Sequence, residues 1–150
     1  MLISTKGRYA TRMLLDIAQH QGDGYVSMKR IAERQGVSKK YLEQFTAQLA
    51  GAGLLDVRRG KQGGYRLARA PEEVTLADIL SLKESSMHAV ACLERVPNRC
   101  ARCETCITLP AWEGLDRVVQ GYLSSVTLQS LLDQAKLQPE DAPAAPECGC

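Results

Sequence analysis

The sequence predicts a mainly α-helical protein with a small β-hairpin wing: a winged helix-turn-helix followed by a long C-terminal dimerisation helix. Hydrophobic residues make up 45% of the 150 residues and aromatic residues 5%, which favours an aliphatic, helical core. Two short segments of helical periodicity flank a turn at Gly36. Two strand-like segments flank a glycine-rich turn at 60–64, and together these features define the class.

Three helices are expected in the first seventy residues. Apolar residues recur at helical spacing over 5–20. Ser27 caps a second helix, and Ser38 caps a third helix that runs to about Ala50. Gly36 supplies the tight turn between these two helices, so the pair is a helix-turn-helix whose second helix would lie in the major groove of DNA.

A β-hairpin is expected directly after the third helix. Residues 54–59 are typical of a strand, 60–64 of a turn and 65–67 of the returning strand. Glycines at the tip would let such a wing approach a phosphate backbone or minor groove closely. A flexible loop is the alternative, but basic residues on both sides favour a nucleic-acid contact. These residues are Arg58, Arg59, Lys61 and Arg66.

Charge is distributed unevenly along the chain. Residues 1–70 carry 13 Lys and Arg against 5 Asp and Glu, a net charge of +8. Residues 71–150 carry 6 against 12, a net charge of −6. A basic half joined to an acidic half is typical of a nucleic-acid-binding module fused to a part with another role. The split therefore favours DNA binding by the first half.

The residues expected to contact double-stranded DNA lie near the start of the first helix, along the third helix and on the wing. They are Thr5, Lys6, Arg8, Ser38, Lys39, Lys40, Tyr41, Glu43, Gln44, Arg58, Arg59 and Lys61. Basic and hydroxyl side chains suit phosphates, while Lys, Gln and Glu also match guanine, adenine and cytosine edges. Each alone is equally consistent with a solvated surface side chain, but the group predicts a DNA-binding surface.

The second half contains two predicted helices. Thr75 caps a short one over 76–82, and a longer one covers 111–124 with Pro110 in its first turn. The longer helix carries an apolar stripe of Leu115, Val118, Val119, Tyr122 and Val126. Such a stripe packs in a core or against a second subunit. Because helix-turn-helix repressors commonly bind palindromic sites as two-fold dimers, we assign it to a homodimer.

The chain is therefore expected to have three parts. Residues 1–70 form the winged helix-turn-helix, and 71–135 hold a cysteine segment and the dimerisation helices. Residues 136–150, rich in Pro, Ala and acidic residues, are expected to be a disordered tail. No apolar run approaches the roughly eighteen residues of a membrane span, and no signal-peptide pattern is seen, so a cytoplasmic protein is expected.

Four cysteines crowd the segment between the two C-terminal helices: Cys92, Cys100, Cys103 and Cys106. In the reducing cytosol such clusters are metal ligands or redox-active thiols more often than disulfides. Zinc sites usually pair two separated Cys-x-x-Cys knuckles. Here two knuckles overlap as Cys-x2-Cys-x2-Cys, which is similar to the ligand run of bacterial ferredoxins. The spacing favours an iron–sulfur cluster and leaves zinc open.

Three motifs in combination have a recognisable pattern. They are Ser4-Thr5-Lys6-Gly7-Arg8-Tyr9-Ala10, then residues 31–38 followed by 41–44, and Arg59-Gly60 leading to Gly63-Gly64-Tyr65. Together they resemble the Rrf-family winged-helix transcriptional regulators of the IscR, NsrR and RirA type. The resemblance continues through the cysteine segment and Trp112, and it covers about residues 1–132.

The resemblance implies a dimeric repressor or dual regulator with a [2Fe-2S] or [4Fe-4S] cluster held by Cys92, Cys100 and Cys106. It places the family's DNA contacts on Ser38, Lys40, Glu43 and Arg59. IscR-like members have a histidine three residues after the last cysteine, where this chain has Leu109. That difference favours a [4Fe-4S] cluster, with Cys103 as the fourth ligand or left free.

The protein is predicted to be a transcriptional repressor. Its DNA affinity is expected to be controlled by an iron–sulfur cluster that senses iron–sulfur status, iron, nitric oxide or redox state. A zinc-stabilised DNA-binding protein and a metal-free thiol–disulfide switch share the same DNA-binding half, so metal content separates them. Cluster-free members such as CymR lack this cysteine set. No catalytic constellation indicates an enzyme. His88 is expected to be a surface histidine, and Cys148 and Cys150 bystanders in the tail.

Overall fold

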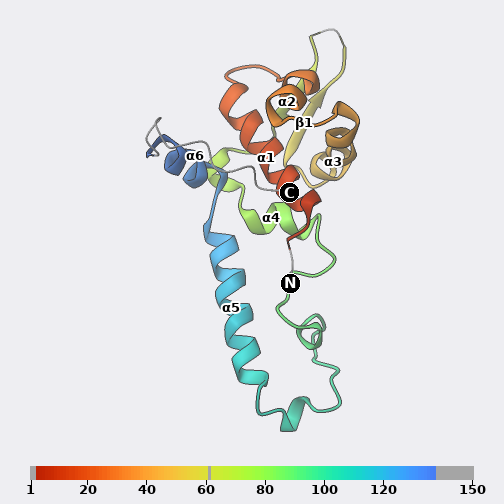
Figure 1. The fold of residues 1–150 in the computed structure, drawn as a ribbon, viewed down its shortest axis with the longest axis vertical. Helices are drawn as coiled ribbons and strands as arrows, with labels where there is room; N and C mark the ends of the chain where they lie inside the picture. Colours follow the sequence, from red (N-terminus) through yellow and green to blue (C-terminus); the bar gives the residue numbers. More distant parts are fainter. Residues whose placement is uncertain (1–2, 61, 138–150) are drawn as a thin grey trace.

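The computed structural model describes residues 3–60 and 62–137 and confirms the predicted fold class. The described residues form six α-helices and one antiparallel hairpin (Figure 1). The helices are α1 (Thr5–His20), α2 (Met28–Gln35), α3 (Lys39–Gly51), α4 (Leu76–Ser81), α5 (Leu109–Ser125) and α6 (Leu128–Leu137). The strands are β1 (Leu55–Arg58) and β2 (Gly64–Leu67), and short 3-10 turns lie at Pro71–Glu73, Ala91–Leu93 and Cys103–Thr105.

Helix α1 is the centre of the core. It begins at the cap Ser4, whose hydroxyl accepts a hydrogen bond from Gly7 N at 3.1 Å. Its apolar face is completely buried and consists of Ala10, Met13, Leu14 and Ile17. This face packs against α2, α3, α4, β2 and α6, so one amphipathic helix organises both halves of the described chain.

The helix-turn-helix has the predicted caps and turn. The Ser27 hydroxyl accepts from Arg30 N at the start of α2, and the Ser38 hydroxyl accepts from Tyr41 N at the start of α3. Gly36 ends α2 at φ 65°, a left-handed conformation that glycine adopts without the steric cost of a side chain. Leu42, Phe45 and Leu49 bury the inner face of α3 as expected from their spacing, so the pair forms the predicted motif.

The hairpin is slightly shorter in its first strand than predicted and one residue longer in its second. Leu55 pairs with Leu67 and Arg58 with Gly64, and an extra bridge joins Tyr65 to Val26 before α2. A side chain at Gly64 would place its Cβ 2.5 Å from Val26 O, so glycine is required for this close approach. The bridge fixes the wing to the helix-turn-helix.

Helix α5 leaves the core, and the cysteine segment runs beside it before joining its first residue (Figure 1). It begins at Leu109, two residues earlier than predicted, with Pro110 in its first turn. Buried Leu123 anchors its other end. Val126 does not belong to the exposed stripe: it is 9% exposed, lies just beyond the helix, and its carbonyl accepts from Leu76 N at 2.9 Å.

Helix α6 was not expected from the sequence. Thr127 and Ser130 cap it reciprocally: the Thr127 hydroxyl accepts from Ser130 N at 3.1 Å, and the Ser130 hydroxyl accepts from Thr127 N at 3.0 Å. Fully buried Leu128 then turns the helix back onto α1. The helix extends through Leu137, past the expected start of the tail at 136, while residues 138–150 lie outside the described part.

Candidate nucleic-acid interface and cysteine segment

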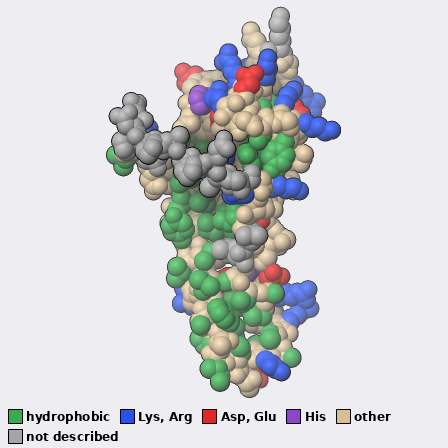
Figure 2. Space-filling model, in the orientation of Figure 1, with side chains coloured by type: hydrophobic (Ala, Val, Ile, Leu, Met, Phe, Trp, Pro, Cys, Tyr) green, Lys and Arg blue, Asp and Glu red, His purple; other side chains and the backbone are tan. Residues whose placement is uncertain are grey.

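A groove of about 560 Å³ lies between the first turns of α2 and α3 and the wing. Four basic side chains line it: Lys29, Lys39, Arg58 and Arg59. The one acidic side chain in its lining is Glu43. Lysine and arginine side chains gather at this end of the molecule in Figure 2. Because fixed positive charge around a concave surface attracts polyanions, the groove has the electrostatics of a DNA contact.

The outer face of α3 presents most of the predicted base-reading residues. Lys39, Lys40 and Gln44 are exposed, and Lys39 Nζ lies 3.4 Å from Glu43 Oε1. This ion pair is open to solvent on both sides, so it costs little to exchange for a phosphate or a base. Ser38 is exposed, and its hydroxyl already caps the helix, which leaves its outer side for a backbone phosphate.

Tyr41 has a packing role that the sequence pattern did not indicate. Its ring meets Tyr9 edge-on at 5.4 Å and Phe45 edge-on at 5.2 Å, between centroids. The side chain is half-buried in this stack. Its ring therefore joins α1 to α3, a packing role in addition to the DNA contact predicted for this residue.

Hydrogen bonds from Tyr25 and Arg66 to Asp56 stabilise the wing. The Tyr25 hydroxyl donates to Asp56 Oδ2 at 2.8 Å, and Arg66 Nη2 donates to the same oxygen at 2.9 Å. The hydrogen bond to Asp56 raises the pKa of Tyr25, and the bonds from Tyr25 and Arg66 lower the pKa of Asp56. The guanidinium of Arg58 lies 5.8 Å from the Tyr25 ring centroid. Arg59 is exposed beside the groove, and Lys61, expected to contact DNA, lies outside the described residues.

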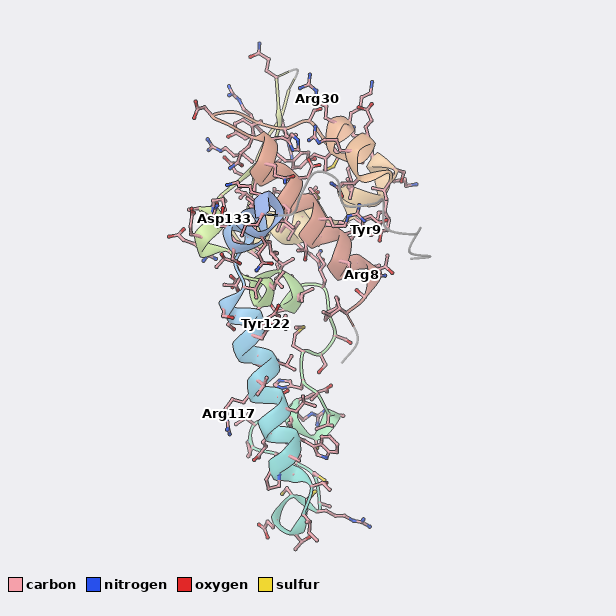
Figure 3. The ribbon with its side chains drawn as sticks, turned by 60° about the vertical axis from the view of Figure 1, so that its left-hand side comes forward. Arg8, Tyr9, Arg30, Arg117, Tyr122 and Asp133 are labelled. Carbon is pink, nitrogen blue, oxygen red and sulfur yellow. The ribbon has the colours of Figure 1, made fainter. Side chains whose placement is uncertain are left out.

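The start of α1 forms a second basic edge. Lys6 is exposed and lines a small pocket with Gln44 and Lys83. Arg8 Nη2 donates to Thr5 Oγ1 at 3.1 Å, and Figure 3 shows Arg8 at this end of the helix, next to Tyr9. The predicted DNA contacts of α1 and α3 thus flank one surface.

The cysteine segment keeps its four thiols free. Cys92, Cys103 and Cys106 are half-buried, and Cys100 is exposed. Within the part of the chain that the structure describes, no three His, Cys, Asp or Glu side chains meet as a metal-binding group. Val96 and Ile107 in the same segment are 99% and 95% exposed. Packing therefore contributes little to the conformation of this segment.

Helix α5 holds both ends of the cysteine segment. At the entry, Asp116 accepts hydrogen bonds from Ala89 N at 2.9 Å and from the His88 ring at 3.0 Å, and Gln120 Nε2 donates to Met87 O at 2.7 Å. Burial raises the pKa of Asp116, but the hydrogen bonds from Ala89 N and from the His88 ring outweigh it, so the pKa is lowered overall. His88, expected to be a plain surface residue, is thus an anchor.

At the exit, Cys106 leads directly into α5. Its carbonyl accepts from Leu109 N at 3.2 Å, and its Sγ lies 3.4 Å from Thr108 Oγ1. The hydrogen bond from Thr108 lowers the pKa of the Cys106 thiol, and backbone N–H groups of Thr108 and Leu109 act in the same direction. A thiol with a lowered pKa is a better metal ligand and a better nucleophile.

Comparison with known proteins gives one consistent family. The family model Rrf2, described as an iron-dependent transcriptional regulator, matches residues 3–134. The protein rrf2 of Nitratidesulfovibrio vulgaris is 39% identical over 142 residues, covering 95% of this chain and 94% of that protein. The chain belongs to the Rrf2 family.

Other relatives of this Rrf2-family protein are helix-turn-helix transcriptional regulators. The IscR regulator of Photorhabdus laumondii is 36% identical over 97% of this chain and 92% of its own length. The structure of T. potens IscR has a TM-score of 0.73 at 38% identity, covering 95% of this chain and 94% of that one. The global cysteine regulator CymR of B. subtilis also has a TM-score of 0.73, at 33% identity, covering 89% and 98%.

Sequence reasoning missed three features of this Rrf2-family site. Lys29 lines the groove although it belongs to α2 and not to α3. Tyr25 and Asp56 support the wing from segments 31 residues apart, and Asp116 anchors the cysteine segment from 27 residues away. Lys29 follows a cap by two residues, a local signal of a first-turn phosphate contact. The two long-range pairs have no local signal.

Proposed function

We propose that this protein is a homodimeric repressor that binds a palindromic double-stranded DNA site, with an affinity controlled by an iron–sulfur cluster in the cysteine segment. The observation that carries the proposal is the pairing of a basic winged-helix groove with four free thiols in a segment held at both ends by α5. The family's description as iron-dependent regulators supports it.

The donor set fits such a cluster. Thiolates are the ligands that iron–sulfur clusters take, and Cys92, Cys100, Cys103 and Cys106 are all free. We assign Cys92, Cys100 and Cys106 as ligands and Cys103 as the fourth, which favours [4Fe-4S]; [2Fe-2S] is the alternative. A bound iron–sulfur cluster supplies a centre that responds to iron supply, nitric oxide and oxidants.

The exposed face of α5 supports a second copy of the chain as partner. Leu115, Val118 and Tyr122 are 46%, 69% and 64% exposed on this helix. Hydrophobic side chains gather over this part of the molecule in Figure 2, and Figure 3 shows Arg117 projecting outward from the same helix. Contiguous exposed apolar residues on one helix are typical of a subunit interface, and a two-fold dimer matches a palindromic site.

In this proposal, α5 links the state of the cysteine segment to DNA binding. Leu109, Asp116 and Gln120 of the helix hold the cysteine segment, and the C-terminal end of the helix is anchored by buried Leu123. The helix also packs against α4. A change in the segment therefore shifts the relative position of the two DNA-binding halves of the dimer. By linkage, whatever changes DNA affinity through the cluster is itself bound differently in the presence of DNA.

A second candidate function is a thiol–disulfide switch without metal. The four free thiols of the segment and the lowered pKa of Cys106 support it. A zinc-stabilised DNA-binding protein is a third. All three share the groove, and they differ in metal content.

Anaerobic purification followed by iron, sulfide, zinc and absorption analysis tests the proposal. The proposal predicts a coloured protein with about four irons and four sulfides per chain, or about two of each for the smaller cluster. Cys92→Ala should lose this iron and stay folded, whereas an exposed control variant, Ser124→Ala, should keep it. Stoichiometric zinc would establish the structural-zinc alternative, and a metal-free protein would leave the thiol switch.

A further inference from the structure

A carboxylate lies over the N-terminus of α1, beside the predicted phosphate contacts. Glu84 Oε1 accepts hydrogen bonds from Ser4 N at 3.0 Å and from Ser4 Oγ at 2.9 Å. The Ser4 hydroxyl oxygen in turn accepts from Gly7 N at 3.1 Å. The first turn of α1 is therefore held by a relay that ends on Glu84, and the partial positive charge of a helix N-terminus stabilises a carboxylate in this place.

Gly7 leaves the space that this carboxylate occupies. The residue is buried, and a Cβ there would overlap Glu84 Oε1 and lie 2.9 Å from Leu80 Cδ2. The glycine is not in a left-handed conformation, so its requirement is steric contact with Glu84 and Leu80 rather than backbone freedom.

Lys83, the preceding residue, reaches the recognition helix. Its Nζ donates to Gln48 Oε1 of α3 and lies 5.1 Å from the centroid of the Phe45 ring. Burial lowers the pKa of Lys83, and the charge of Lys6 adds to this effect. Two consecutive residues thus contact the two helices that present the predicted DNA contacts.

These two residues stand directly before the cysteine segment. Ser85 and Ser86 alone separate Glu84 from the stretch 87–89, which α5 holds through Asp116 and Gln120. Three Cα–Cα steps of about 3.8 Å join Glu84 to Met87, so these two Cα atoms stay within about 11 Å of each other. A movement of the segment's entry beyond this limit is therefore passed on to Lys83 and Glu84.

We infer that Lys83 and Glu84 are positioning residues that hold the start of α1 and helix α3 in the DNA-binding arrangement, and that the cysteine segment acts on DNA affinity through them. The inference rests on the proposed function and adds the residues through which the cysteine segment changes DNA affinity. The contacts seen here correspond to the state with higher DNA affinity, and their release lowers that affinity.

The test compares Glu84→Ala, Glu84→Gln and the control Glu72→Ala, which removes the same charge at an exposed position of the 3-10 turn Pro71–Glu73. The probe is a duplex that the wild-type protein selects from a random pool, and affinity is measured for metal-loaded and chelator-stripped protein. Loss of a carboxylate alone raises affinity for DNA. The inference predicts the opposite for Glu84→Ala. In the form that binds more tightly, its affinity for the duplex should be about tenfold below that of Glu72→Ala, and its two forms should differ little.

Glu84→Gln keeps an oxygen that accepts both bonds from Ser4, so it should restore most of the affinity and of the difference between forms. Gly7→Ala displaces the carboxylate from the other side and should reproduce Glu84→Ala, with no further loss in the double variant. It also decides the question if Glu84→Ala does not fold. Iron content should match wild type in each variant, which separates positioning from cluster loss.

The inference is overturned if Glu84→Ala or Gly7→Ala binds the duplex as tightly as Glu72→Ala does and shows the same ratio of metal-loaded to stripped affinity. That outcome leaves the proposed function standing. A wild-type protein with equal affinity in both forms overturns the proposed function and this inference together.

Discussion

Asp16 of α1 and Arg34 of α2 form an ion pair in which the carboxylate is 2% exposed and the arginine side chain 32% exposed. Arg34 Nε lies 2.9 Å from Asp16 Oδ2, and Gln35 Nε2 donates to the same oxygen at 3.0 Å. Arg12 in turn donates to Gln35 Oε1 at 2.9 Å. This network fixes the first helix of the helix-turn-helix against the central helix of the core.

Replacing Asp16 by Ala should lower the free energy of unfolding by about 2–3 kcal/mol, because Arg34 and Gln35 lose charge-assisted hydrogen bonds to a carboxylate that is 2% exposed. Urea denaturation measures this loss. The matched control is Glu33→Ala, which breaks the exposed pair with Lys29 and should change stability by no more than about 0.5 kcal/mol. Equal effects of the two substitutions would contradict the role given to the buried pair.

Acid should remove the contribution of the Asp16 carboxylate to the free energy of unfolding. Burial raises the pKa of Asp16, but hydrogen bonds from Arg34 and Gln35 outweigh it, so the pKa in the folded protein is lowered. A lowered pKa contributes stability that is fully present above the unfolded value, about 3.9, and is lost as pH falls through the folded value. Urea midpoints between neutral pH and acid should therefore converge for wild type and Asp16→Ala below about pH 4. A difference between the two urea midpoints that stays constant with pH would contradict the stabilising role given to the ionised Asp16.

Arg59→Ala should weaken DNA binding about tenfold at moderate salt and reduce the slope of log affinity against log salt by about one, because the exposed guanidinium beside the groove neutralises one phosphate. Titration of the selected duplex at several salt concentrations measures both. Lys136→Ala on α6 removes the same charge from a residue paired with Asp133 and should leave the slope unchanged. Unchanged affinity for Arg59→Ala would remove the wing from the interface.

Val118→Glu should convert the homodimer to a monomer, because Val118 is 69% exposed in the middle of the α5 stripe and a charge there would be buried between subunits. Sedimentation equilibrium measures the change. Gln134→Glu, an exposed position on α6, adds the same charge and should leave the dimer intact. A wild-type monomer, or a dimeric Val118→Glu, would contradict the proposed interface.

Local patterns were sufficient for the winged helix-turn-helix. Periodicity gave the inner faces of α1 and α3, and Ser27, Gly36 and Ser38 marked the caps and the turn. Helix α6 was missed although the reciprocal caps of Thr127 and Ser130 are a local signal, three residues apart, of a helix start.

Contacts between distant residues were beyond any local pattern. Glu84 and Ser4 are 80 residues apart, and Lys83 and Gln48 are 35 apart. Their pairing follows from how α4 packs on α1, and periodicity does not encode that packing. The same holds for Tyr41, whose side chain reads as a DNA contact from its place on the helix but stacks between Tyr9 and Phe45.

The affinity of the anaerobically purified protein for its selected duplex, measured before and after removal of the cluster, tests the central claim most directly. The account predicts that the affinities of the metal-loaded and stripped forms differ about tenfold or more, and that both forms keep the same fold. Identical affinities, with iron and sulfide shown to be present in one sample and absent from the other, would contradict control of DNA binding by the cysteine segment.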